Sequence, residues 1–447
     1  MTILAQCIPK FFHHLTSHLP PLWQRDCGTF RPAQVLFTLM MMASRQNQGY
    51  KLVIDELKRS VGHELGWENT PSASSFCEAR RKLSVDQCRD ALSFIRTKCT
   101  ALKRRKRVIY GDYRLLAVDM TKLALPAYED VRSIFGCPKD AKRRTAAAPQ
   151  GTLTVLWDVS TNTPIDWTLE KVYSSERLAA QGFMHHLGAR DLLIADRGYP
   201  SRQFFSDVAE QAAAYLVRVP IGSRGGFKEV YEFSRNKDAW DRIVHLHIDN
   251  KRMGKPTLAV RLFKIKLPSG DIAIFATNLL NKKRHRRKSL GALYCYRWDL
   301  ETAFREMKVW YGLENFAARY AEGIQQEVAA LMIFMQLTAE LEAQALDYHD
   351  VKTKKVVTEN HPLVPEFRFN RRYVCICVGY LMAAAADGPA KLAEMYDYAM
   401  SQLWRYRQRR KPGRAFERIA KSPNSKWKRS TYNTKAKASK SREKLKN

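Results

Sequence analysis

Residues 294–308 contain four side chains whose chemistry suits a site that handles phosphates. They lie three, four and seven residues apart and are Tyr294, Arg297, Glu301 and Lys308. On an α-helix of about 3.6 residues per turn these positions fall within roughly 60° of one another, so we expect them on one stripe of a single helix. The stripe beside it is apolar and would seat the helix against a core; it contains Leu300, Ala303, Phe304 and Met307. A carboxylate flanked by phosphate-binding cations suits a metal-dependent enzyme that cuts nucleic acid.

The same four residues also fit an ordinary solvated helix surface. In that interpretation Arg297 and Glu301 form an i,i+4 ion pair that stabilises the helix by a few tenths of a kcal/mol. Taken alone, the stretch favours this plain surface. The rest of the chain favours the interpretation as a site that handles phosphates.

The charge of the chain points to a polyanionic partner. The 447 residues carry a formal net charge of +32, which suits nucleic acid or an acidic membrane surface. The basic residues occur in several segments: 103–107, 142–144, 282–288 and most of the tail from Arg405. Such a distribution fits an extended DNA duplex better than one membrane-facing helix. For the tail, disorder and nonspecific DNA binding both stay open.

The sequence gives no sign of secretion or of a membrane span. The longest apolar runs are 35–43, 329–337 and 373–386, which are shorter than the ~20 residues that cross a bilayer, so we expect buried helices. The nine cysteines show neither zinc-ligand spacing nor the framework of a disulfide-rich secreted domain. We therefore expect a soluble intracellular protein without a membrane partner.

The N-terminal part, residues 1 to about 105, has the periodicity of helices. Within it, residues 70–83 resemble a cap followed by a short helix with a basic end, and Ser84 is expected to cap a helix over 88–95. A small DNA-binding unit of helix-turn-helix type and a plain helical bundle with a basic face both fit this pattern.

The pattern changes to strands after residue 114. Helical periodicity interrupts it at 178–188, and again before residue 213. A β-rich segment thus separates Asp196 from the helix that bears Glu301, and an α/β sheet with helical cover is expected. The expected strands are 115–118, 152–158, 165–172, 192–195, 213–219, 227–233, 243–248, 258–267 and 272–277.

Two aspartates follow apolar strands. Asp119 and Asp196 each lie at or just past the C-terminal end of a predicted buried strand, where α/β sheets place ligand-binding groups. If the two strands are neighbours, Glu301 can complete a cluster of three carboxylates. Since no Cys or His lies at ligand spacing, the cluster selects a hard cation, Mg²⁺ or Mn²⁺, and two such ions would support phosphoryl transfer. Arg297 and Lys308 would hold phosphates.

Other aspartates compete for this role. Asp112, Asp158 and Asp191 lie close by in the sequence, and spacing does not exclude them. Asp158 falls inside an alternating strand and Asp191 precedes an apolar run, so both are better explained as surface positions.

With both Asp motifs in place, the chain resembles the DDE transposases of the insertion-sequence-four family. The Tyr-x2-Arg-x3-Glu-x6-Lys signature at residues 294–308 is similar to that family's. Its first Asp follows an apolar strand, as in Leu115-Leu-Ala-Val-Asp119, and its second opens an Asp-x-Gly-aromatic turn, as in Asp196-Arg-Gly-Tyr199. A β-rich insertion precedes the Glu, and the resemblance covers roughly residues 70–345.

The resemblance implies a ribonuclease H-like core and cut-and-paste movement of a DNA element. Asp119, Asp196 and Glu301 would bind two Mg²⁺ (or Mn²⁺) ions. Contacts to phosphates at the transposon end would come from Tyr294, Arg297 and Lys308. Trp298 matches an aromatic that in some members lies near the cleaved terminus; core packing is its alternative role. The partners would be double-stranded DNA, as transposon ends and target, and a second copy of the chain in a homodimer, in the nucleoid and cytoplasm of a bacterium.

The expected organisation has five parts. The segments are a helical DNA-binding domain at 1–105, the first part of the core at 106–200, the β-rich insertion at 201–288, the second part of the core with the catalytic helix at 289–345, and a helical region with a basic tail at 346–447. Two alternatives stay open: a metal-dependent DNA nuclease with the same core, and a catalytically silent DNA-binding protein derived from a transposase.

Overall fold

The computed structural model describes residues 30–46, 49–62, 67–106, 109–139, 146, 148–221, 227–247, 257–267, 270–349, 353–354, 364–365, 367–386 and 389–409. The described residues up to Gln408 belong to one compact unit. The basic run at 142–144 and the basic tail beyond Arg409 lie outside the described residues.

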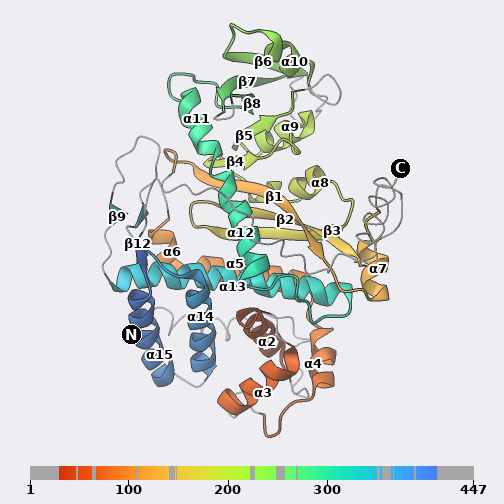
Figure 1. The fold of residues 1–447 in the computed structure, drawn as a ribbon, viewed down its shortest axis with the longest axis vertical. Helices are drawn as coiled ribbons and strands as arrows, with labels where there is room; N and C mark the ends of the chain where they lie inside the picture. Colours follow the sequence, from red (N-terminus) through yellow and green to blue (C-terminus); the bar gives the residue numbers. More distant parts are fainter. Residues whose placement is uncertain are drawn as a thin grey trace, which may run out of the picture. The chain divides into compact units, whose positions relative to one another are not determined.

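A mixed sheet of eight strands forms the centre of this unit, in the order β3-β2-β1-β4-β5-β8-β7-β6 (Figure 1). The first three strands pair antiparallel, β4 and β5 continue in parallel with β1, and β8, β7 and β6 extend the sheet antiparallel. The bounds are β1 Arg114–Ala124, β2 Gln150–Asp158, β3 Thr163–Lys171, β4 Asp191–Ala195, β5 Ala214–Val219, β6 Asp241–His247, β7 Thr257–Lys266 and β8 Ile272–Thr277.

The α/β prediction is confirmed, and the β-rich segment continues the same sheet. β5 pairs in parallel with β4, so this strand is shared between the core sheet and the segment expected as an insertion. The five-part division of the chain stays a prediction.

One expected strand is wrong. Residues 227–233 lie mostly in helix α10 (Lys228–Arg235), whose buried side chains are Val230 and Phe233. These two residues are three positions apart, so a helix buries both on one face, whereas a strand would point them to opposite faces.

The two faces of the sheet belong to two separate apolar clusters. On β1, Leu115 and Ala117 contribute to one cluster and Leu116 and Val118 to the other, as strand alternation requires. The first face packs against helices α12 (Arg297–Val309) and α13 (Ala321–Tyr348), and the second against α8 (Glu176–Gln181) and α9 (Arg202–Glu210).

A helical body surrounds α13, which is buried along most of its length (Figure 1). The expected helices over the three apolar runs are confirmed as parts of α2 (Pro32–Ser44), α13 and α14 (Arg371–Ala386). Ser84 caps α5 (Val85–Lys98) in a reciprocal box with Gln87, also as expected. Within the described residues, no helix is both long and apolar enough to cross a membrane. The other elements are α3 Tyr50–Val61, α4 Ala73–Arg80, α6 Thr100–Arg104, α7 Glu129–Phe135, η2 Met184–His186, α11 Arg287–Tyr294, α15 Pro389–Arg405, β9 Thr353–Lys354, β10 Val364–Pro365, β11 Phe367–Arg368 and β12 Gln408–Arg409.

The single helix expected over 294–308 is two helices. α11 ends at Tyr294, and α12 begins at Arg297. Between them the Cys295 N–H donates to the Ala292 carbonyl, an i→i−3 bond that tightens the chain into a turn. Tyr294 nevertheless stays beside Arg297, whose guanidinium lies 5.9 Å from the centre of the Tyr294 ring.

Candidate active site

The strand register places Asp119 and Asp196 side by side. Val118 on β1 pairs with Ala195 on β4, which ends there, so Asp119 and Asp196 are the next residues along the two strands. Leu192 and Ile194 lie on the same face as Ala117, and by alternation both aspartates follow onto this face, which α12 covers. Asp119 was expected at the end of its strand, but β1 continues to Ala124 because β2 still pairs with it.

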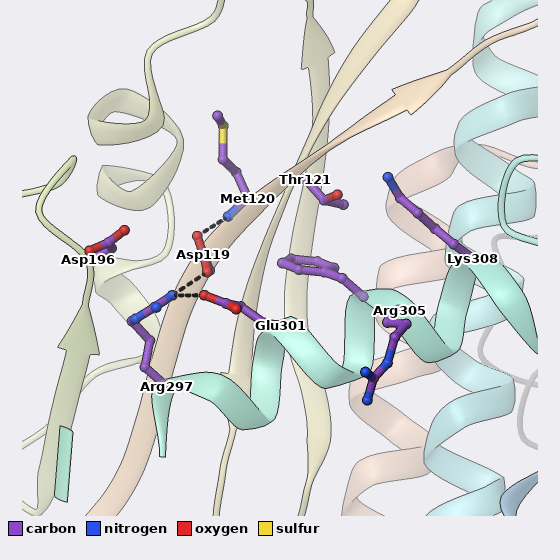
Figure 2. A pocket seen from close by; sticks show the side chains of 9 residues that line it. Asp119, Met120, Thr121, Asp196, Arg297, Glu301, Arg305 and Lys308 are labelled. Carbon is purple, nitrogen blue, oxygen red and sulfur yellow. Dashed lines mark hydrogen bonds and ion pairs between the residues drawn. The ribbon is translucent and has the colours of Figure 1, made fainter. Parts of the chain in front are cut away.

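Helix α12 brings Glu301 to the two aspartates. Its apolar stripe, predicted from spacing, is buried: Leu300, Ala303, Phe304 and Met307. The burial fixes the rotation of the helix and leaves Glu301 facing the ends of the strands. Figure 2 shows Glu301 reaching toward Asp119 across the first face of the sheet, with Asp196 on the neighbouring strand.

Arg297 lies between two of the carboxylates. Its Nη1 donates to Asp119 Oδ2 at 3.0 Å and contacts Glu301 Oε1 at 2.6 Å (Figure 2). The Arg297 side chain is only 8% exposed, whereas that of Glu301 is 36% exposed. The i,i+4 ion pair of the surface interpretation exists, but its arginine is buried and also contacts Asp119. The Arg297 guanidinium balances negative charge within the cluster.

The electrostatics of Asp119 reflect its crowded surroundings. The pKa of its carboxyl is raised to about 6; burial is the largest cause, and the charges of Asp196 and Glu301 act in the same direction. The Met120 N–H, which donates to Asp119 Oδ1 at 2.8 Å, and the Arg297 cation oppose this shift. Like charges held this close make the cluster a ready site for a cation.

Asp196 is held by the turn that it opens. The Arg197 N–H donates to Asp196 Oδ1 at 2.6 Å, and the Tyr294 hydroxyl donates to the same oxygen at 3.4 Å. Tyr294 thus reaches the cluster from the end of α11. At Gly198, a Cβ would lie 2.5 Å from Glu176 Oε2, so the end of that side chain would have to move.

The three carboxylates line an open pocket of about 410 Å³. Among the described residues, Asp196 Oδ2 and Glu301 Oε2 have no hydrogen-bond partner, so oxygens remain for a ligand. The full lining is Asp119, Met120, Thr121, Asp196, Arg297, Glu301, Phe304, Arg305 and Lys308.

Lys308 and Trp298 lie at the edge of this site. Lys308 Nζ donates to the Lys122 carbonyl on β1 at 2.6 Å and lies 3.7 Å from Glu314 Oε1, so it ties α12 to the strand. Trp298 is 51% exposed, and the Arg297 guanidinium lies 5.1 Å from the centre of its ring. Such exposure disagrees with a core packing role.

The competing aspartates have other surroundings. Asp112 is exposed in a turn before β1. Asp158 and Asp191 were expected at the surface, but each is only 5% exposed. Asp191 is paired with Arg114, and the Ser160 and Thr161 N–H groups donate to Asp158 Oδ1. Buried carboxylates need such partners, and these partners explain the two residues without a ligand.

Comparison with protein families decides the identity. The model described as Transposase DDE domain matches residues 110–337, which contain all three carboxylates. The chain belongs to the DDE transposase family. It is therefore a phosphoryl-transfer nuclease that acts in DNA transposition.

Two further comparisons complete the picture. No curated protein sequence matches this transposase. Among solved structures, a cryo-EM structure of the piggyBac transposase synaptic complex with hairpin DNA aligns with a TM-score of 0.41 and 12% identity, covering 92% of this chain and 84% of that chain. A likeness this distant carries no argument about function.

The donor set of the transposase fits the divalent ions that DDE transposases generally use. Three carboxylates from three elements supply hard oxygen ligands, and two of their oxygens are unbonded within the described part of the chain.

Two residues near the site were missed in the sequence. Arg305 lines the pocket one helical turn after Glu301, a spacing that helix geometry alone could have indicated. Glu176 precedes the second Asp by 20 residues, and no sequence signal connects them. Burial raises the pKa of Glu176, and the charge of Asp196 raises it further.

Proposed function

We propose that this enzyme is a cut-and-paste transposase of the insertion-sequence-four type, which cleaves DNA at the ends of its element and joins them to target DNA. The observation that carries the proposal is the gathering of Asp119, Asp196 and Glu301 around one open pocket. The Tyr-x2-Arg-x3-Glu-x6-Lys signature supports the assignment to this family type.

Asp119, Asp196 and Glu301 would hold two Mg²⁺ or Mn²⁺ ions. When bound, such ions activate a water or a 3′-hydroxyl and stabilise the leaving oxygen in an in-line phosphoryl transfer. The carboxylates would fix the place of this chemistry, because Asp119 lies within β1, Asp196 directly follows β4 and Glu301 lies on a packed helix.

Arg297 has two consecutive roles in this proposal. Without a metal, its guanidinium balances the charges of Asp119 and Glu301. With ions held by the carboxylates, Arg297 would be suited to bind a DNA phosphate through its planar fork of donors. Lys308 and Tyr294 would contact phosphates at the same end, and the exposed ring of Trp298 would lie against the cleaved terminus.

Cut-and-paste movement needs both element ends in one complex. We therefore propose that two copies of the chain act as a dimer on two ends of double-stranded DNA. The N-terminal helices would recognise the end sequence. Deleting residues 1–105 is expected to abolish sequence-specific end binding.

A cleavage assay tests the proposed function. Supercoiled DNA bearing the terminal repeats of the element is incubated with the wild-type enzyme or with Glu301→Gln, in Mg²⁺ or in EDTA. We expect double-strand breaks at both ends and integrated products only for the wild type in Mg²⁺. Breaks without integration would instead support the plain nuclease, and tight binding without cleavage would support the silent DNA-binding protein.

A further inference from the structure

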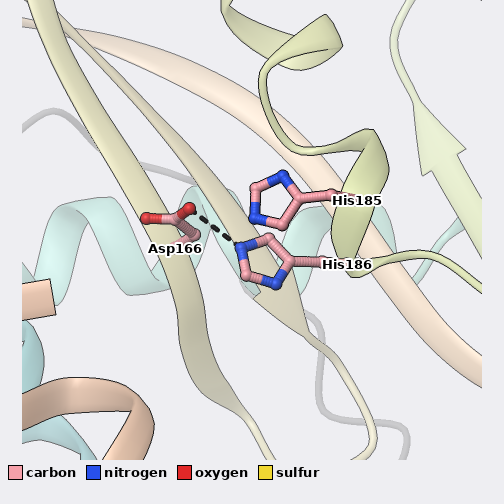
Figure 3. Close-up of side chains that lie close together, drawn as sticks. All are labelled: Asp166, His185 and His186. Carbon is pink, nitrogen blue, oxygen red and sulfur yellow. Dashed lines mark hydrogen bonds and ion pairs between the residues drawn. The ribbon is translucent and has the colours of Figure 1, made fainter. Parts of the chain in front are cut away.

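A second cluster of metal-ligating side chains lies on β3 and on the segment before β4. Asp166 belongs to β3, and His185 and His186 belong to the 3₁₀ helix η2. One ligand atom from each of the three residues lies within 4.8 Å of the others. Figure 3 shows the two imidazole rings beside each other, both near the Asp166 carboxylate. This cluster shares no residue with the pocket around Asp119.

The positions of Asp166 and His186 are fixed by the surrounding structure. Asp166 Oδ1 accepts the Trp167 N–H at 2.7 Å, which leaves Oδ2 for His186 Nε2 at 2.9 Å. The His186 carbonyl in turn accepts from Arg114 Nη2 at 3.1 Å. Contacts that orient the ligands in this way raise metal affinity, because less order has to be created on binding.

His185 supplies the adjustable third ligand. Its side chain is exposed, and its ring centre lies 3.9 Å from that of His186. A ring with this freedom can turn one nitrogen toward an ion held by the other two residues. The fourth position would face solvent, as in zinc sites with three protein ligands and a water.

The ligand chemistry differs from that of the carboxylate cluster. Two imidazoles and one carboxylate suit a borderline cation such as Zn²⁺, whereas Mg²⁺ prefers oxygen ligands and keeps several of its waters. Arg89 Nε lies 3.7 Å from Asp166 Oδ1 and would lower the affinity, so we expect weaker binding than at four-ligand structural sites.

We propose that Asp166, His185 and His186 bind one zinc ion. The ion would join β3, at the edge of the sheet, to the segment that leads into β4 and Asp196. Such a link would hold the catalytic strand in place from outside the active site. The proposal is independent of the proposed function, because its ligands, its metal and its readout are different.

Calorimetric titration of zinc into the full-length, EDTA-treated and dialysed protein tests this proposal, with excess Mg²⁺ present to occupy the carboxylate cluster. The comparison is between wild type, His185→Gln and the control His245→Gln, which changes an exposed histidine on β6. Since His185 is exposed, its replacement leaves the core unchanged, and circular dichroism verifies the fold. Co²⁺ serves as a spectroscopic probe through its visible absorption.

We expect His185→Gln to weaken zinc binding at one site at least about tenfold, to lose the zinc-dependent rise in Tm and to lose the Co²⁺ absorption. His245→Gln should behave as the wild type. Equal zinc affinity in wild type and His185→Gln, or no binding by either, would overturn the proposal, whatever the outcome of the cleavage assay.

Discussion

Two arginine–carboxylate clusters lie along β1 and β4, and they differ in how fully their oxygens are bonded. At the start of the strands, Arg114 donates from Nε and Nη2 to both oxygens of Asp191, and the Gly188 N–H adds a third bond. At the other end, Arg297 contacts one oxygen of Asp119 and one of Glu301. The same residue types thus form a closed cluster and an open one.

We interpret the closed cluster as structural and the open cluster as the proposed ligand site. The closed cluster satisfies its carboxylate with fixed protein donors, so a metal would have to displace them. The open cluster faces a pocket and leaves Asp196 Oδ2 and Glu301 Oε2 without a partner among the described residues. Like charges held this close are costly for the free protein, and a bound cation would offset that cost.

The largest expected effect is on cleavage. Asp119→Asn should lower the rate of end cleavage by roughly 10²–10³-fold or more, because it removes a ligand of the proposed ions without changing side-chain size. Asp191→Asn should instead lower the free energy of unfolding by about 1–3 kcal/mol and leave cleavage by the folded protein within a factor of a few. Cleavage kinetics and urea unfolding of both variants measure this contrast. Slow cleavage by Asp191→Asn together with normal cleavage by Asp119→Asn would refute the distinction between the clusters.

Replacing Arg297 should also affect cleavage, by a smaller factor. Arg297→Gln leaves Asp119 and Glu301 without their shared cation and removes a proposed phosphate contact, so we expect roughly a 10²-fold slower cleavage. Arg305→Gln is the matched control, since Arg305 lines the same pocket. Equal losses in the two variants would mean that positive charge at the pocket matters rather than the bridging position.

In the metal-free protein, the open cluster should make the stability of the folded state depend on pH. Because the pKa of Asp119 is raised to about 6, the folded state binds a proton there more tightly than the unfolded state does. This group therefore favours folding at acidic pH, and its contribution is lost as the pH rises toward and above about 6. Thermal unfolding in EDTA should show a smaller loss of Tm between acidic and neutral pH for Asp119→Asn than for the wild type. Identical pH profiles would contradict the assignment.

The smallest effect is expected at Lys308. Lys308→Met removes the hydrogen bond to the Lys122 carbonyl and should lower the free energy of unfolding by about 0.5–1.5 kcal/mol. If Lys308 also contacts a phosphate, the slope of log affinity for DNA against log salt should fall by about 1. Denaturant unfolding and DNA binding at several salt concentrations separate the two roles.

Much of the fold was predictable because local pattern determines it. The apolar runs of β1 and β4 indicated the strands, and the apolar stripe of α12 indicated which side of that helix faces the core. The break after Tyr294 was not predictable, since a two-residue turn leaves the spacing of functional side chains almost unchanged.

The residues of the candidate site were predictable from the sequence, but the contacts that each residue makes were not. Asp191 and Asp196 flank the same strand, and only the register with β1 shows that one meets Arg114 and the other lies next to Asp119. The cluster of Asp166 with His185 and His186 was missed for the same reason, because it depends on β3 packing beside η2. Such contacts arise from tertiary structure, and spacing in the sequence does not predict them.

We expect the open cluster to bind divalent metal and the closed cluster not to bind it. Electron paramagnetic resonance of free Mn²⁺ measures this directly in protein without DNA, in a His185→Gln background that removes the histidine cluster. We predict that Asp119→Asn and Glu301→Gln each weaken Mn²⁺ binding at least about tenfold, while Asp191→Asn binds as its parent does. Mn²⁺ binding that is equal in all four proteins, or absent from the parent, would contradict the account.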